Sequence, residues 1–171
     1  ASTITQQLVR QRLLDPDLVQ DPKRQLERKL KEIIQSIRLT QAFEGKAGKQ
    51  EIITSYLNQN YYGNQTYGVK AAAKAYFGKD VSKLTPSEGA FLASVIRGPS
   101  FYDPGLGAEQ KANAEARWTY VMDGMVTEGW LTPAQRAAAK FPTVLKAPKA
   151  TGASGPTGFL VDQVKRELKA K

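Results

Sequence analysis

The chain has 171 residues, of which 41% are hydrophobic, so it is long enough for one domain with a proper core. Its 25 lysines and arginines outnumber 16 acidic residues, and the net charge of +9 favours an anionic partner: nucleic acid, anionic lipid or a phosphate-bearing substrate. The chain contains neither histidine nor cysteine, which excludes imidazole and thiol chemistry and the usual ligands of zinc, iron and copper.

The sequence also carries few signals of targeting or membrane insertion. It has no run of about 18 apolar residues, so we expect no membrane span within it. It begins at Ala1 directly in a patterned segment, and we expect it to be a piece of a longer protein.

Three helices are predicted in the first sixty residues, over 3–14, 22–43 and 49–58. Thr3 and Gln6 have the spacing of a capping box at the start of the first. Asp15-Pro16-Asp17 should end that helix, and Pro22 is at a tolerated first-turn position of the second. We expect a turn over Gly45 to Gly48 before the third.

Further helices are predicted over 69–77, 85–98 and 108–128, with a short one starting at 132. Gly78 should stop the first of them. Thr85-Pro86-Ser87-Glu88 combines a cap, a first-turn proline and an acidic third residue, which is a strong helix start. No strand signal is convincing, so the predicted fold class is all-α.

The domain organisation predicted from this pattern has three parts. Residues 1–141 form the folded domain. Residues 142–158, rich in proline, lysine, glycine and alanine, form a linker. Residues 159–171 form an amphipathic helix that starts a following segment.

The helix over 22–43 carries the pattern that most needs an explanation. Five apolar residues share one narrow stripe of it, and we expect this stripe to be buried: Leu26, Leu30, Ile33, Ile34 and Ile37. Glu32 falls near the opposite side, among cations that include Arg28 and Lys31. The simplest interpretation is a solvated pair of Arg28 and Glu32, worth a few tenths of a kcal/mol.

Four blocks of the sequence, in order, resemble motifs of the peptidoglycan glycosyltransferases, the chain-polymerising domain of class A penicillin-binding proteins and their monofunctional relatives. Ser2-Thr3-Ile4-Thr5-Gln6-Gln7-Leu8 is similar to the second motif of that family. The other blocks resemble the third, fourth and fifth motifs: Arg28-Lys29-x-x-Glu32 with Tyr56-Leu57-Asn58, Leu84-Thr85-x-x-Glu88 with Pro99-Ser100-x-Tyr102-Asp103-Pro104, and Arg117 with Gly129-Trp130-Leu131.

The resemblance implies a mostly helical, lysozyme-like domain that polymerises lipid II into glycan strands. In that family a sugar hydroxyl attacks the anomeric carbon of the growing chain, the configuration inverts and undecaprenyl pyrophosphate leaves. Carried over to this sequence, Glu32 is the second of two catalytic glutamates. The residues implied to line the donor side or to bind the pyrophosphate are Gln6, Gln7, Arg10, Arg24, Arg28, Lys31 and Arg117.

The resemblance further implies partners and a location. The partners would be lipid II, the growing lipid-linked glycan and the outer face of the bacterial membrane, with a transpeptidase domain in the full-length chain. A magnesium or manganese ion could bridge the pyrophosphate. No basic stripe interleaved with aromatic residues suggests a nucleic-acid partner.

The first motif of the family, with its Glu-Asp pair, is not in this sequence, so we expect these 171 residues alone not to polymerise glycan. Without the resemblance, Gln6 and Gln7 could be polar groups of a helix end, and Glu88 a capping residue. Arg117 could equally form a structural ion pair. Two other functions stay open: a lysozyme-like lytic glycosidase, which would need a carboxylic acid with a raised pKa, and a non-catalytic module that binds pyrophosphate lipid or anionic polymer.

Overall fold

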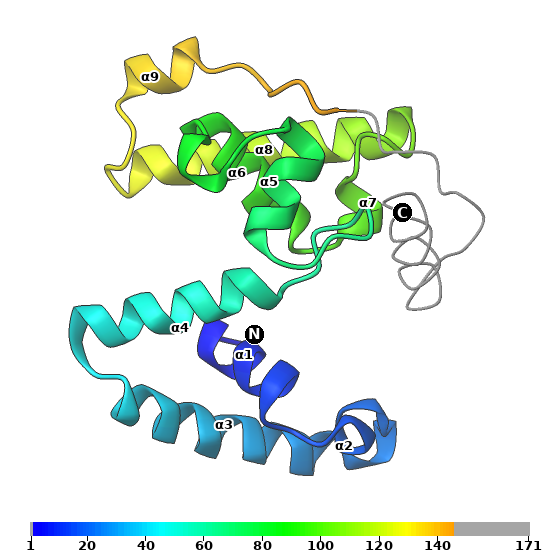
Figure 1. Cartoon of the computed structure of the whole chain (residues 1–171), viewed down its shortest axis with the longest axis vertical. Helices are drawn as coiled ribbons and strands as arrows, with labels where there is room; N and C mark the ends of the chain where they lie inside the picture. The colour runs from blue at the N-terminus through cyan, green and yellow to red at the C-terminus, as the bar shows by residue number, and fades with distance from the viewer. Residues whose placement is uncertain (1, 146–171) are drawn as a thin grey trace, which may run out of the picture. The chain divides into compact units, whose positions relative to one another are not determined.

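The computed structural model describes residues 2–145, which are helical with connecting loops (Figure 1). They fall into two compact units, divided between Asn60 and Tyr61. The predicted all-α class is confirmed, since the described residues form no strand beyond one isolated bridge between Tyr61 and Tyr67. None of the described helices combines the length and apolar character needed to cross a membrane.

The first unit consists of four α-helices and one short 3₁₀ helix. Their bounds are α1 Ile4–Arg12, α2 Pro16–Gln20, η1 Pro22–Arg24, α3 Gln25–Ala42 and α4 Gly45–Gln59. The predicted capping box is present, because Thr3 Oγ1 accepts from the amide of Gln6 while the Gln6 side chain accepts from the amide of Thr3. α1 contacts both α3 and α4, and this packing builds the candidate site (Figure 1).

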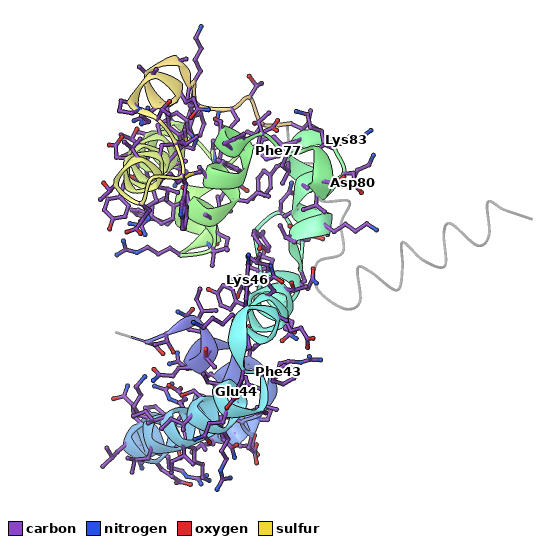
Figure 2. All side chains as sticks on the ribbon, turned by 90° about the vertical axis from the view of Figure 1, so that its left-hand side faces the viewer. Phe43, Glu44, Lys46, Phe77, Asp80 and Lys83 are labelled. Carbon is purple, nitrogen blue, oxygen red and sulfur yellow. The ribbon has the colours of Figure 1, made fainter. Side chains whose placement is uncertain are left out.

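In this unit one helix was not predicted and one local prediction was wrong. The first helix ends before Asp15-Pro16-Asp17 as expected, but Asp15 also caps the additional short helix α2. The turn expected over Gly45 to Gly48 is instead the first turn of α4, which follows Phe43 and Glu44 at the α3–α4 connection (Figure 2). Gly48 is required there, since a Cβ would lie 2.2 Å from the Phe43 backbone.

The expected orientation of α3 was also wrong. The predicted apolar stripe is solvent-exposed within the described residues, from 37% for Ile33 to 75% for Leu26, whereas Glu32 is 0% exposed. Periodicity identified correctly which residues share a face of the helix. It could not identify the face that meets α1, because the polar residues of that face find their hydrogen-bond partners on α1.

The second unit has its own aromatic and aliphatic core. Its elements are α5 Val69–Phe77, η2 Val81–Lys83, α6 Pro86–Val95, α7 Pro99–Tyr102, α8 Ala108–Thr127 and α9 Pro133–Ala138. Phe91 of α6 lies at its centre, with edge-to-face contacts to Tyr76, Phe77 and Phe141 at centroid distances of 5.2 to 5.8 Å. Figure 2 marks Phe77 near the end of α5, before Asp80 and Lys83.

Helix ends in this unit follow the sequence signals. Gly78 adopts the left-handed conformation at φ +67° and ends α5. Thr85 and Glu88 form the predicted capping box, and Lys79 pairs with Glu88 at 2.6 Å. This supports the capping interpretation of Glu88. Most of the predicted linker over 142–158 and the predicted helix over 159–171 lie outside the described residues.

The hydroxyl of Tyr76 binds the loop that begins at Tyr61 to the core of the second unit. This buried hydroxyl donates to the carbonyl oxygen of Tyr62 at 2.8 Å and lies 3.4 Å from a carboxylate oxygen of Asp103. Burial and the nearby Asp103 carboxylate raise the pKa of the Tyr76 phenol, so it stays a neutral donor.

The substitution Tyr76→Phe should therefore lower the free energy of unfolding by about 1–3 kcal/mol, because it removes the buried hydrogen bond from Tyr76 to the carbonyl of Tyr62. Urea unfolding of the chain measures this. Tyr67→Phe is the control, since Tyr67 is 69% exposed and should change stability by less than about 0.5 kcal/mol. Equal effects of the two substitutions would contradict the assignment.

Candidate active site

The centre of the candidate site is an ion pair between α1 and α3. Arg10 donates to both carboxylate oxygens of Glu32, from Nε at 2.5 Å and from Nη2 at 3.0 Å. This bidentate geometry matches the planar guanidinium to the planar carboxylate, which a lysine could not do. Glu32 is fully buried and Arg10 about one-third exposed, so the pair has one side in the protein and one toward solvent.

Two further cations complete the surroundings of Glu32. Lys29 Nζ donates to Oε2 at 3.2 Å. Arg28 Nε lies 3.5 Å from Oε1, near enough for an ion pair but without hydrogen-bond geometry, and this buried nitrogen has no hydrogen-bond partner within residues 2–145. Three cations thus face one carboxylate, and the group keeps an excess of positive charge. We call Arg10, Arg28, Lys29 and Glu32 the Glu32 cluster.

The protonation of Glu32 follows from these contacts. Burial by itself raises the pKa of this carboxyl, but the hydrogen bonds and charges of Arg10 and Lys29 outweigh burial, and the net pKa is lowered. The same ion pair raises the pKa of Arg10. Glu32 is therefore an ionised carboxylate at neutral pH and a poor proton donor.

The structure places Arg24 and Lys31 in a different group, around Glu27. Arg24 donates to both oxygens of Glu27 at 2.8 and 2.9 Å, and Lys31 Nζ lies 2.8 Å from Oε1. Their hydrogen bonds lower the pKa of Glu27 to about 2. This Glu27 cluster is on the exposed side of α3, so the expectation that Lys31 lies beside Glu32 was wrong. One helical position separates Lys31 from Glu32, which directs their side chains to different faces.

Gln6 connects the N-terminal turn of α1 to the Glu32 cluster. Its Oε1 accepts from Lys29 Nζ at 3.0 Å and from Ser2 Oγ at 3.0 Å. Gln6 is thus a capping residue and a neighbour of the cluster at once. Gln7 contacts α4, where its Oε1 accepts from Tyr56 Oη at 3.2 Å.

A cleft of about 590 Å³ opens beside the Glu32 cluster. Its lining residues are Ser2, Arg10, Gln25, Leu26, Arg28 and Lys29. Among the described residues of this lining the only ionisable groups are three cations, so the cleft suits an anion with several oxygens, such as a phosphate or pyrophosphate.

The described residues do not fit a divalent cation at this site. Within residues 2–145 no three acidic side chains lie close enough to hold one. Both oxygens of Glu32 already accept from Arg10 and Lys29. We therefore derive no step through a metal ion.

Comparison with known proteins identifies the family. The model of the family described as "Transglycosylase" matches residues 1–126. The chain belongs to the transglycosylase family. It is 41% identical over 98% of its length to penicillin-binding protein 1A of Mycobacterium tuberculosis and 42% identical over 79% of its length to that of Escherichia coli.

The same transglycosylase relationship is present in three dimensions. A crystal structure of penicillin-binding protein 1A from Haemophilus influenzae superposes with a TM-score of 0.55 and 31% identity, covering 74% of this chain and 18% of that one. The chain spans 20% of the length of the mycobacterial relative and 14% of that of the Escherichia coli relative.

Arg117 belongs to the second unit of this transglycosylase chain. Its guanidinium carbon lies 4.5 Å from the centroid of the Tyr120 ring, and its buried Nε has no hydrogen-bond partner in the part of the chain that the structure describes. The structural ion pair considered for it is not formed among the described residues. The neighbouring Trp118 is a core residue whose Nε1 donates to the carbonyl oxygen of Ser87 at 3.0 Å.

Lys29 is the residue of the cluster that sequence reasoning missed. It stands beside Arg28 in the block that resembles the third motif of the family. A signal was available, because Lys29 and Glu32 are three residues apart and therefore neighbours on a helix surface. The contact of Lys29 with Gln6, 23 residues away, required the packing of α1 on α3.

The lowered pKa of Glu32 predicts a pH-dependent stability. The carboxylate should make its full contribution to the free energy of unfolding above about pH 4.3, the ordinary pKa of a glutamate in the unfolded chain. This contribution should be lost as the pH falls through the lower pKa that Glu32 has in the folded protein. At pH 7, Glu32→Gln should cost about 3–5 kcal/mol, because three cations lose their buried counter-charge. Urea unfolding from pH 7 to pH 2 measures both effects.

Comparing the wild type with Glu32→Gln isolates the contribution of Glu32 to the pH dependence of stability. Glu27, Asp80 and Glu88 also have lowered pKa values, but wild type and variant share them. The difference in stability should therefore shrink as the pH falls below about 4.3. A difference that stays constant down to pH 2 would contradict the assigned protonation of Glu32.

Proposed function

We propose that the chain is part of a peptidoglycan glycosyltransferase that polymerises lipid II into glycan strands, with inversion at the anomeric carbon and release of undecaprenyl pyrophosphate. The observation that carries this proposal is the Glu32 cluster: an ionised, buried carboxylate that holds Arg10, Arg28 and Lys29 beside a cationic cleft. Membership of the transglycosylase family supports it.

The cluster suits a reaction whose leaving group becomes more negative. As the bond from the anomeric carbon to the pyrophosphate oxygen breaks, the electron pair stays on that oxygen. Fixed cations stabilise this developing charge more than the ground state and so lower the barrier. Glu32 sets the positions of these cations and reduces their mutual repulsion before the substrate arrives.

The protonation of Glu32 argues against a lytic glycosidase. That reaction needs a carboxylic acid whose pKa is raised, so that it can protonate the leaving sugar oxygen. The pKa of Glu32 is lowered by its hydrogen bonds to Arg10 and Lys29, although burial opposes the shift. A phosphate-type leaving group needs no such proton, which is consistent with an ionised Glu32.

The remaining site residues are proposed from the resemblance. Gln6 and Gln7 would form the donor-side wall at the start of α1. Arg24, Lys31 and Arg117 are proposed to bind pyrophosphate on the resemblance alone, since their contacts here are with Glu27 or Tyr120. Because the first motif is not among these 171 residues, we expect them not to polymerise glycan by themselves.

The proposal includes the setting of the reaction. The lipid-linked donor and lipid II would reach the site at the extracytoplasmic face of the bacterial membrane. A transpeptidase domain would accompany this one in the full-length protein, as the resemblance to class A penicillin-binding proteins implies.

Substitutions in the full-length protein test the role of the cluster. Arg10→Ala should reduce polymerisation of lipid II by about a hundredfold or more, because it removes a cation from the cleft and leaves Glu32 partly unpaired. Glu32→Gln should also reduce it strongly, since the cations lose their fixed positions. Gel analysis of glycan chains made from labelled lipid II measures both rates.

Arg38→Ala is the matched control, because Arg38 is an exposed arginine of α3, the helix that carries Glu32, and lies nine residues beyond Lys29 of the cleft. It should leave the rate within about twofold. Unchanged polymerisation in Arg10→Ala and Glu32→Gln would remove the cluster from the mechanism. A full-length protein that cleaves glycan strands and does not extend them would overturn the proposed reaction.

A further inference from the structure

Two hydrogen bonds, one helical turn apart, join α1 to α4 and to Asn60, the C-cap residue of α4. Tyr56 Oη donates to Gln7 Oε1 at 3.2 Å, and Gln11 Nε2 donates to Asn60 Oδ1 at 2.9 Å. The partners are four residues apart on both helices, so the two bonds link the same pair of helix faces. The first ends on a residue of the candidate site, and the second lies one turn further along α1.

The surroundings of Gln7 fix the direction of its carboxamide. Its Nε2 faces the carbonyl oxygen of Ser2 at 3.5 Å, while its Oε1 faces the Tyr56 hydroxyl. A rotation of the amide by 180° would set two acceptors, Gln7 Oε1 and the Ser2 carbonyl, against each other. Tyr56 is only 6% exposed and belongs to the long helix α4, so its hydroxyl is a fixed point of attachment.

Polar contacts continue from Gln7 to the Glu32 cluster. Ser2, whose carbonyl faces Gln7, donates its hydroxyl to Gln6 Oε1 at 3.0 Å. Lys29 donates to the same Gln6 oxygen and to Glu32. Gln7 is thus the outer member of a connected polar group, and Tyr56 holds it from α4.

We propose that Tyr56 is a positioning residue of the glycosyltransferase site, which orients Gln7 toward the lipid-linked sugar without touching that substrate. The inference rests on the proposed function, where Gln7 belongs to the donor-side wall. One N–H of the Gln7 amide faces Ser2, and the other has no acceptor among residues 2–145. In this proposal the bond to Tyr56 sets the direction of that second N–H, which would donate to a sugar or phosphate oxygen.

The test is Tyr56→Phe in the full-length protein, which removes the hydroxyl and keeps the buried ring. We expect kcat/KM for polymerisation of lipid II to fall about fivefold or more, the equivalent of one hydrogen bond. Gln11→Ala is the matched control, because it removes the neighbouring α1–α4 hydrogen bond outside the site. It should lower the melting temperature at least as much as Tyr56→Phe and change kcat/KM by less than about twofold.

A double-mutant cycle with Gln7→Ala separates positioning from a structural role. Gln7→Ala should lower kcat/KM about tenfold, and adding Tyr56→Phe should then have no further effect, since the residue through which Tyr56 acts is gone. A full Tyr56→Phe effect in the Gln7→Ala background would overturn the inference. So would equal losses of kcat/KM in Tyr56→Phe and Gln11→Ala.

The same assays distinguish this inference from the proposed function. An active wild type in which Tyr56→Phe leaves kcat/KM unchanged would overturn the positioning role alone. A full-length wild type with no polymerising activity would overturn the proposed function, and the positioning role with it.

Discussion

The first unit depends on the burial of one carboxylate. Glu32 is removed from water on α3, and three cations from α1 and α3 surround it. A buried charge of this kind is costly unless it is paired and hydrogen-bonded, so the packing of α1 on α3 has to keep Arg10 in bidentate contact. The constraint explains why a helix with a well-formed apolar stripe turns its polar face inward.

The positive excess around Glu32 links the architecture to the proposed chemistry. Hydrophobic residues of similar volume would stabilise the α1–α3 contact at least as well as a buried ion pair. An ion pair with surplus cations at the wall of a cleft has a further property, because it presents fixed positive charge to an incoming anion without reorganisation. The stability of the unit and the proposed handling of pyrophosphate thus involve the same four side chains.

Attachment of α1 from two sides gives the site its rigidity. Arg10 and Gln6 contact α3, while Gln7 contacts Tyr56 of α4. Successive residues of one helix point in different directions, so a single short helix can carry contacts to both neighbours. Side chains held from two directions keep the narrow range of geometry that a catalytic wall needs.

The sequence by itself determined the all-α class, the capping boxes at Thr3 and Thr85, the stop at Gly78 and, through four motif blocks, the family. The helix caps and the helix stop depend on hydrogen bonds between residues close in the chain, and the family depends on the order of the motif residues along it. Tertiary structure decided which face of α3 is buried, that Lys29 and not Lys31 contacts Glu32, and that Tyr56 holds Gln7. Periodicity places side chains around one helix axis, but the partner that a face meets comes from residues far along the chain. Arg10 lies 22 residues from Glu32, and Tyr56 lies 49 from Gln7.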